Sequence, residues 1–319
     1  MKEHFIAQLT VESLVRTTFL VQSKERKIAR SGSAYLDVDL RDSSGVIRAK
    51  LWDSDRQALD FEVDDVVRIE GDVEDFQGTL QLRIRRISKC ADESVNLLDY
   101  LPRTSHDPDV MFAALLNRVR GMPEGPLRAL VVSVLEDPRI AEKFKLAPAA
   151  TSYHHAYLGG LLEHVTSLVE LGDRIADHYP SLDRNLMVAG LVLHDLGKIE
   201  ELNFRRGFHY STRGQLVGHM AIGLELLRDK MRSLADFPAD LKNRIEHIIL
   251  SHHGKLEFGS PKEPMFPEAL VVHCLDDLDS KLESMRAQYA VDKDREGHWT
   301  TRNRALGREL LKGVAHDPS

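Results

Sequence analysis

Up to about residue 90, apolar residues recur at every second position of the chain. The stretches SAYLDVDLRD, GVIRAKLWD and DVVRIEGDVEDFQGTLQLRIRRIS show this alternation, which is typical of strands with one buried face. In the first stretch we assign Tyr35, Val38 and Leu40 to the buried side. Turn-forming residues at 31–33, 43–45 and 77–78 separate the stretches. About five strands of this kind predict an OB-type β-barrel over residues 1–90.

The spacing of apolar residues becomes helical from about residue 105 onward. The stretches DPDVMFAALLNRVRGM, GPLRALVVSVLED and GGLLEHVTSLVELGDRIADHY carry it, and further ones follow to the end. A segment of mixed polarity, from about Cys90 to His106, is the best candidate for a linker. We therefore expect a multi-domain protein with α and β parts: the barrel, a linker with leading helices over 91–150, and an all-α bundle with a helical tail over 151–319.

The composition is that of a globular protein with more than one domain, since 42% of the 319 residues are hydrophobic. No uninterrupted apolar run has the length of a membrane span, so we expect a cytoplasmic protein without a membrane partner. The net charge of −7 argues against adhesion to nucleic acid through bulk charge and leaves only local basic strips. The two cysteines, Cys90 and Cys274, exclude a disulfide framework and are expected to be buried and inert.

One ionisable pair, His194 and Asp195, ends the apolar stretch LMVAGLVL and is followed at once by LGK. Burying such a pair is costly unless it is bound to something. Neutral imidazole and carboxylate are ligands for divalent metals, and adjacent residues can reach one ion or two ions bridged by the carboxylate. By itself an HD dipeptide is weak evidence, because a lone histidine is more often a core or capping residue.

More residues of metal-binding type follow in order on other predicted helices. They occur in GGLLEHV, LVGHMAIG, ILSHHGK and VVHCLDD and are His164, His219, His252 and Asp276. Side chains from several helices of a bundle can converge on one interior site, as bundle metal centres require. The order of these residues therefore makes a metal site a stronger hypothesis than the HD dipeptide alone.

The succession H…HD…H…H…D over roughly residues 150–290 resembles the HD phosphohydrolase superfamily. Because all six ligand positions occur in order, the chain is similar to those members of the superfamily that hold two metals. On that resemblance the helical part is an HD-domain bundle. The first metal's ligands would be His164, His194, Asp195 and Asp276. Asp195 would bridge to the second metal, whose site His219 and His252 would complete.

The chain also resembles a narrower group, the bacterial YhaM-type 3′-5′ exoribonucleases, which place an OB-fold before an HD domain. The likeness lies in HHAYLGGLLEHV, HDLGKIEEL, LVGHM and SHHGKLEFGSPKEP. It implies single-stranded RNA or DNA as substrate, hydrolysis from the 3′ end, and two divalent ions with manganese as the expected metal. Imidazole and carboxylate ligands also suit iron, cobalt and zinc, and magnesium is a further candidate.

Catalytic roles are assigned to Asp195, which would orient the attacking water, and to Lys198, which would meet a phosphate oxygen or protonate the leaving group. An equally plausible alternative is that Lys198 is a solvated lysine whose charge complements the dipole at a helix end. The candidate substrate contacts in the helical part all lie shortly after a metal-binding motif. For the lysines and arginines among them, an incidental place on the surface is an equally plausible alternative. They are His253, Arg205, Arg206, Lys255 and Lys262.

Basic and aromatic residues of the barrel form the other candidate substrate surface. Arg83 and Arg85 lie on a late predicted strand, and the aromatic residues are Tyr35, Trp52 and Phe76. Cations and aromatic rings on a strand face are typical of a groove for single-stranded nucleic acid. Each aromatic residue taken alone is more often part of a core.

The leading hypothesis from the sequence is a metal-dependent 3′-5′ exoribonuclease that acts on single-stranded RNA, with DNA left open as a further substrate. One alternative is an HD-type phosphodiesterase or nucleotidase for small cyclic or dinucleotides. The other is a nucleic-acid-binding adaptor whose metal site is structural, although six ligand positions in order argue against a degenerate site. The oligomeric state is not indicated by the sequence.

Overall fold

A computed structural model describes residues 2, 4–29, 32–52, 59–76, 78–91, 96–152, 154–204, 207–293 and 295–313. The chain forms two compact units, one over Met1–Arg103 and the other over Thr104–Phe204 and Phe208–Ser319. None of the helices in these described ranges combines the length and the apolar character needed to cross a bilayer.

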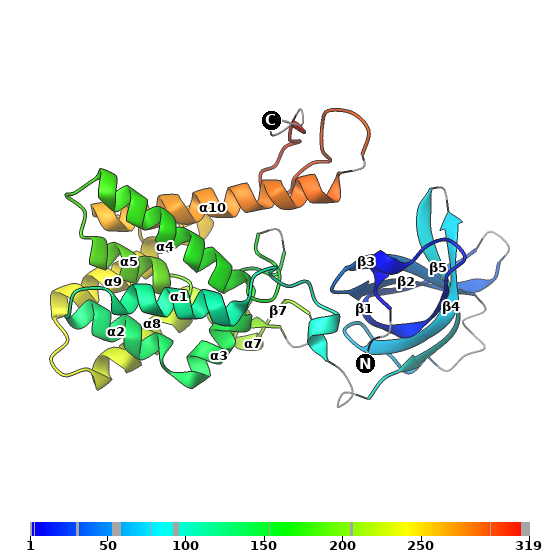
Figure 1. Ribbon diagram of the computed structural model, residues 1–319, viewed down its shortest axis with the longest axis horizontal. Helices are drawn as coiled ribbons and strands as arrows, with labels where there is room; N and C mark the ends of the chain where they lie inside the picture. Colours follow the sequence, from blue (N-terminus) through cyan, green and yellow to red (C-terminus); the bar gives the residue numbers. More distant parts are fainter. Residues whose placement is uncertain are drawn as a thin grey trace. The chain divides into compact units, whose positions relative to one another are not determined.

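The first unit is built on a closed five-stranded barrel, as the alternating pattern predicts (Figure 1). The strands follow in the order β1-β2-β3-β5-β4, in which β3 and β5 are parallel and the other pairs antiparallel. Short 3-10 turns at Ile6–Gln8 and Leu97–Asp99 flank it. The strands are β1 (Leu14–Ile28), β2 (Ala34–Asp42), β3 (Gly45–Trp52), β4 (Val66–Phe76) and β5 (Thr79–Lys89).

The barrel core confirms the period of two but corrects one face assignment. On β2 the buried core residues are Leu36, Val38 and Leu40. Successive side chains of a strand point to opposite sides, so Tyr35 lies on the other face, where its ring contacts Trp52 at 4.9 Å between centroids. An irregularity in the β4–β5 pairing lets β5 direct core residues inward at an uneven spacing, as bulges do.

The second unit is a helical bundle with one small two-stranded sheet, β6 (Leu202–Asn203) with β7 (His209–Tyr210) (Figure 1). A 3-10 turn, Leu256–Phe258, lies in the loop after α9. The helices are α1 (Pro108–Arg120), α2 (Pro126–Leu135), α3 (Pro138–Leu146), α4 (Gly160–His178), α5 (Arg184–Leu193), α6 (Lys198–Glu201), α7 (Thr212–Val217), α8 (His219–Ser233), α9 (Ala239–Ser251) and α10 (Pro267–Val291).

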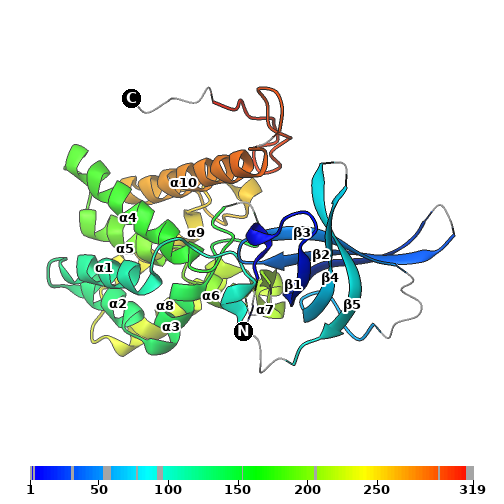
Figure 2. The same cartoon turned by 45° about the vertical axis from the view of Figure 1, so that its right-hand side comes forward.

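Helix α5 is the central element of the bundle. Every residue from Leu186 to Leu193 is buried, and a helix that is apolar on all sides requires neighbours all round. Its neighbours are α2, α4, α9 and α10, and Figure 2 shows the long α10 running beside α4. Asp183 begins the helix by accepting hydrogen bonds from the first backbone amides. His194 and Asp195, which follow the C-terminal end of α5, are therefore buried inside the bundle.

Two details differ from the sequence-based expectations. After α10 the described residues to position 313 form isolated β-bridges, Trp299 with Leu311 and Asn303 with Arg308, in place of the expected helical tail. The Asn303 side chain bonds to Ser284 of α10 and holds this segment back along the helix. Cys274 is exposed, not buried, because it lies on the outer face of α10.

Candidate metal centre

The six residues that the sequence singles out meet in the interior of the bundle. His164 comes from α4, His194 and Asp195 follow α5 directly, and His252 follows α9. His219 is the first residue of α8, and Asp276 lies on α10. The histidines at 164, 194 and 252 and Asp195 are at most 1% exposed. Five helices thus contribute to a single buried cluster.

Asp195 lies at the middle of this cluster and reaches both sides of it. Its Oδ2 is 3.3 Å from Nε2 of His194 and 3.9 Å from Nε2 of His164. Its Oδ1 is 3.5 Å from Nε2 of His219 and 3.6 Å from Nε2 of His252. Asp276 Oδ1 closes the first side, at 3.3 Å from Nε2 of His164 and 3.8 Å from Nε2 of His194.

The glycine of the HDLGK segment explains how α8 approaches so closely. A Cβ on Gly197 would lie 1.9 Å from the carbonyl oxygen of His219. Only glycine lets the two backbones touch in this way. The contact holds the first turn of α8, and with it the His219 ring, against Asp195.

Each of the four histidines uses Nδ1 for a hydrogen bond on the outer side of the cluster. The acceptors of His194 and His252 are backbone carbonyls, Leu191 O at 2.9 Å and Ile249 O at 2.7 Å. His164 faces a carboxylate at 2.7 Å and His219 another at 3.1 Å. A carbonyl oxygen can only accept, so the Nδ1 atoms of His194 and His252 carry the proton, and the geometry assigns the same tautomer to the others. The Nε2 atoms then point inward, where a metal would take their lone pairs.

Two buried polar atoms in the middle of the cluster have no hydrogen-bond partner, His194 Nε2 and Asp195 Oδ1. Buried polar groups are nearly always satisfied, so an orphan pair of acceptors needs an explanation. Both atoms are electron-pair donors directed toward other donors of the same kind. A cation with nitrogen and oxygen ligands would satisfy all of them at once, and the residues present therefore fit a bound metal.

Lys198 lies inside the site, not on a solvated helix end. Its Nζ is 2.6 Å from Asp195 Oδ2. Burial alone would raise the pKa of Asp195, but Lys198 and His194 hold that pKa well below its ordinary value. Burial would lower the pKa of Lys198, but Asp195 and Asp276 raise it. The site therefore keeps an ionised carboxylate and a charged ammonium side by side.

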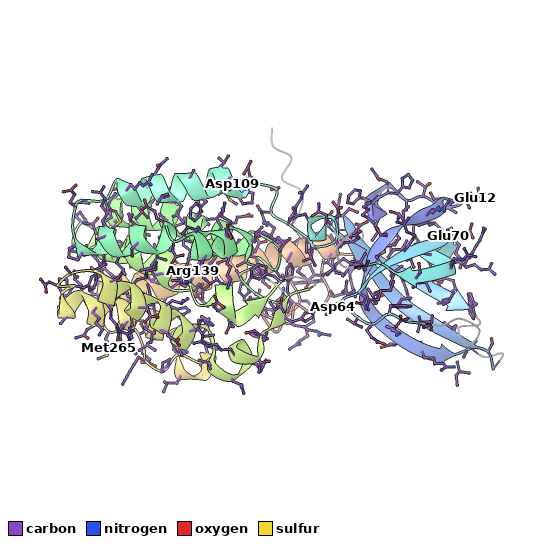
Figure 3. All side chains as sticks on the ribbon, turned by 90° about the horizontal axis from the view of Figure 1, so that it is seen from below. Glu12, Asp64, Glu70, Asp109, Arg139 and Met265 are labelled. Carbon is purple, nitrogen blue, oxygen red and sulfur yellow. The ribbon has the colours of Figure 1, made fainter. Side chains whose placement is uncertain are left out.

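His253 is the expected substrate contact that the structure brings to the cluster. Its ring lies 5.1 Å from that of His219, and its Nδ1 donates to Phe258 O at 3.0 Å. Lys255 and Lys262 are exposed on the loop after α9. Met265, at the end of this loop, projects from the surface (Figure 3). Arg205 and Arg206 lie outside the described residues.

Three residues that the sequence did not place at the site contact the cluster. Asp279 accepts from His164 and His155, and Glu201 accepts from His219. His155 is buried, although histidines before a helix are commonly on the surface. His154 is half-buried nearby, and burial together with Lys198 lowers its pKa to about 4. The sequence offers one signal for Asp279, its position about one helical turn after Asp276. It does not indicate which side chain Asp279 binds.

In the first unit, the expected aromatic residues form a surface cluster on the barrel together with Lys50, which the sequence did not single out. Trp52 and Phe76 are 39% and 49% exposed. Lys50 lies between them, 4.7 Å from the Phe76 ring centroid and 5.7 Å from that of Tyr35. We call Tyr35, Lys50, Trp52 and Phe76 the aromatic platform. Arg83 pairs in register with Lys50 on the neighbouring strand, whereas Arg85 is bound to Asp72 at 2.6 Å.

Both units match models of known families. Residues 161–281 match the HD domain, and residues 15–89 match an OB-fold nucleic acid binding domain. The fold and the His/Asp cluster thus define an HD-domain protein with an N-terminal OB-fold. Membership of the HD domain class implies dependence on a divalent metal, which agrees with the donor set of the cluster.

Curated relatives narrow the class to one family. The chain is 36% identical over 302 residues to the 3′-5′ exoribonuclease YhaM of Bacillus subtilis and 34% identical over 302 residues to that of Bacillus licheniformis, covering 93% of this chain and 94% of either relative. Among solved structures, a domain of replication protein A from Methanococcus maripaludis is similar at 21% identity, with a TM-score of 0.24, over 27% of this chain and 92% of that one. The chain belongs to the YhaM family of 3′-5′ exoribonucleases.

Proposed function

We propose that this protein is a metal-dependent 3′-5′ exoribonuclease that removes nucleotides from the 3′ end of single-stranded RNA. Family membership supports the reaction, since relatives of nearly equal length are 3′-5′ exoribonucleases. The observation that carries the proposal is the inward convergence of four imidazole Nε2 atoms on Asp195, with every Nδ1 held from outside. Such a set has no purpose in a purely structural helix bundle.

In this proposal the six residues would hold two divalent ions, with manganese as the first candidate. Asp195 would be shared by the two ions, because its two oxygens face different histidines. His164, His194 and Asp276 would complete the set for the first ion, and His219 and His252 that for the second. When bound, the ions would lower the pKa of a water and offset charge on the phosphate.

The residues around the ions account for the remaining chemistry. Asp195 stays ionised beside Lys198 and His194, so that it can orient a water by accepting a hydrogen bond. Lys198 keeps its charge and can stabilise negative charge that develops on a phosphate oxygen. His253, with its Nδ1 proton held by Phe258 O, presents its Nε2 at the edge of the cluster, where a terminal nucleotide would enter.

The aromatic platform supports single-stranded nucleic acid as the partner of the barrel. Exposed rings beside a lysine on strand faces allow bases to stack while the cation meets the backbone. All four of its members make contacts within the platform, Tyr35 with Trp52 and Lys50 with Phe76, so the rings are preformed. The exoribonuclease activity of the relatives supports RNA, in preference to DNA, as the substrate.

The direction of cleavage can be tested with end-labelled RNA. We expect a 5′-labelled single-stranded RNA to shorten through a ladder of products, and a 3′-labelled one to release labelled mononucleotide from the first turnover. Denaturing gels and thin-layer chromatography measure the two products. Release of mononucleotide first from the 5′ label, or a single internal cut, would contradict the proposal.

Metal binding is expected to release a proton and to strengthen as the pH rises toward about 9. Burial would lower the pKa of His164, but Asp276 and Asp279 raise it to about 9 in the metal-free protein. Below that pH a metal has to displace the Nε2 proton, so affinity rises by up to about tenfold per pH unit. Calorimetry in buffers of different ionisation enthalpy checks this. Binding without proton release near neutral pH would count against the assignment of His164.

A further inference from the structure

The cluster has two halves, each facing one oxygen of Asp195. The first half consists of His164, His194 and Asp276, around Oδ2. The second half consists of His219 and His252, around Oδ1, and their Nε2 atoms are 3.4 Å apart. In each half one histidine bonds a backbone carbonyl through Nδ1, and the other bonds a carboxylate. The two carboxylates, Asp279 and Glu201, are outside the ligand set.

Asp279 supports the first half of the cluster, and both oxygens of its carboxylate accept hydrogen bonds. Its Oδ2 accepts from His164 Nδ1 at 2.7 Å and from His155 Nε2 at 2.9 Å. Its Oδ1 accepts from Ser167 Oγ at 2.9 Å. Three donors on one carboxylate stabilise its ionised form. The His164 ring is thereby fixed in orientation by a negative charge directly behind it.

His155, which donates a hydrogen bond to Asp279, is itself held in a fixed position. His155 is buried and has φ +44°, a left-handed conformation that residues other than glycine rarely adopt. Its Nδ1 accepts from the hydroxyl of Tyr157 at 2.8 Å. A Cβ on Gly160 would lie 2.1 Å from the His155 carbonyl oxygen, so the α4 start is packed directly against this residue. A chain Tyr157, His155, Asp279, His164 results.

Glu201 supports the second half in a matching way. One oxygen, Oε1, accepts from the backbone amide of His219 at 2.8 Å and from its Nδ1 at 3.1 Å. It therefore holds both the first amide of α8 and the ring that this residue presents to Asp195. The Glu201 carbonyl accepts from Ser211 at 2.8 Å, which fixes the end of α6.

We propose that Asp279 and Glu201 are positioning residues that separately set the metal affinity of the two halves, Asp279 that of the first and Glu201 that of the second. The inference rests on the proposed function, because it takes both halves as metal sites. A carboxylate behind a ligating imidazole orients the ring and strengthens Nε2 as a donor, and its loss typically weakens metal binding by about 10–100-fold. His194 and His252 rely on backbone carbonyls, so among the Nδ1 partners of the four histidines only Asp279 and Glu201 can be changed by a side-chain substitution.

The test is a titration of the metal-free full-length protein with Mn²⁺, followed by calorimetry. The wild type is expected to bind two equivalents. Asp279→Asn and Glu201→Gln, which keep the side-chain shape, should each weaken one equivalent by about 10–100-fold and leave the other unchanged. In a His164→Ala background, Glu201→Gln should weaken the equivalent that remains, whereas Asp279→Asn should not.

Matched controls lie next to each residue. Asp277→Asn, on the same helix as Asp279, removes only a partly exposed pair with Lys281, and Glu200→Gln removes only a pair with Lys143. Both should bind Mn²⁺ as the wild type does, and thermal melts of the metal-free variants confirm folding. Two unchanged equivalents in Asp279→Asn, or equal weakening of both, would overturn the inference. A wild type that binds no Mn²⁺ would instead overturn the proposed function.

Discussion

The Asp195→Asn variant is expected to lose RNA hydrolysis by on the order of 10³-fold or more while it keeps its fold. Among the residues that the structure describes, Asp195 is the carboxylate whose oxygens face both halves of the cluster, at 3.3 Å from His194 and 3.5 Å from His219. Asparagine keeps the shape but offers only one oxygen and no charge. Both metal positions and the partner of Lys198 are therefore impaired at once. Single-turnover rates on a short RNA, together with metal content, measure the loss.

The control for this variant is Asp277→Asn, which removes a carboxylate of the same chemistry at a partly exposed position. Its rate and metal content should equal those of the wild type. Circular dichroism separates a chemical loss from unfolding, because burying Lys198 without its partner also costs stability. Turnover by folded Asp195→Asn at the wild-type rate would remove the metal mechanism.

The Trp52→Ala and Phe76→Ala variants are expected to weaken binding of single-stranded RNA without affecting chemistry at the cluster. Stacking of a base on an aromatic ring contributes about 1–3 kcal/mol, which corresponds to roughly 5- to 150-fold in Kd for each ring. Both rings are exposed beside Lys50 and do not support the barrel core. Fluorescence anisotropy with a labelled RNA measures Kd, and turnover of a small chromogenic phosphodiester should stay unchanged.

Val46→Ala is the matched control, since Val46 lies on the same face of β3 as Trp52 and is 47% exposed. It removes a surface side chain of the strand outside the platform. RNA binding by this variant should equal that of the wild type. If the aromatic variants and Val46→Ala bind RNA equally well, the platform is not the RNA surface.

Local patterns were sufficient to predict the barrel and the helical bundle, whereas the set of six cluster residues was predicted from the resemblance to the HD superfamily. Alternation located the strands, because one face of each packs into a single core. The apolar stretch before His194 indicated a helix that ends in an ionisable pair, and in the structure both that helix and the pair are buried. The assignment of Tyr35 to the core was wrong because an aromatic residue in a strand satisfies either face, and only the register decides between them.

The residues behind the cluster could not be predicted, because their partners are distant in the chain. Asp279 binds a histidine 115 residues away, and His219 binds Glu201 across 18 residues. Neither spacing belongs to a helix or a strand. The role of His155 could not be predicted either, since its left-handed backbone and its burial depend on packing against α4. Sequence therefore indicates which residues donate to a metal more readily than which residues orient them.

The most direct test of the central claim is the shortening of a 5′-labelled single-stranded RNA by protein of known metal content, before and after chelation and again after addition of Mn²⁺. We expect about two equivalents of metal, stepwise shortening from the 3′ end, loss of shortening with chelator and recovery with Mn²⁺. Shortening that continues in metal-free protein would contradict the metal mechanism. Two bound equivalents without any shortening would contradict the RNA substrate and favour a phosphodiesterase for small nucleotides.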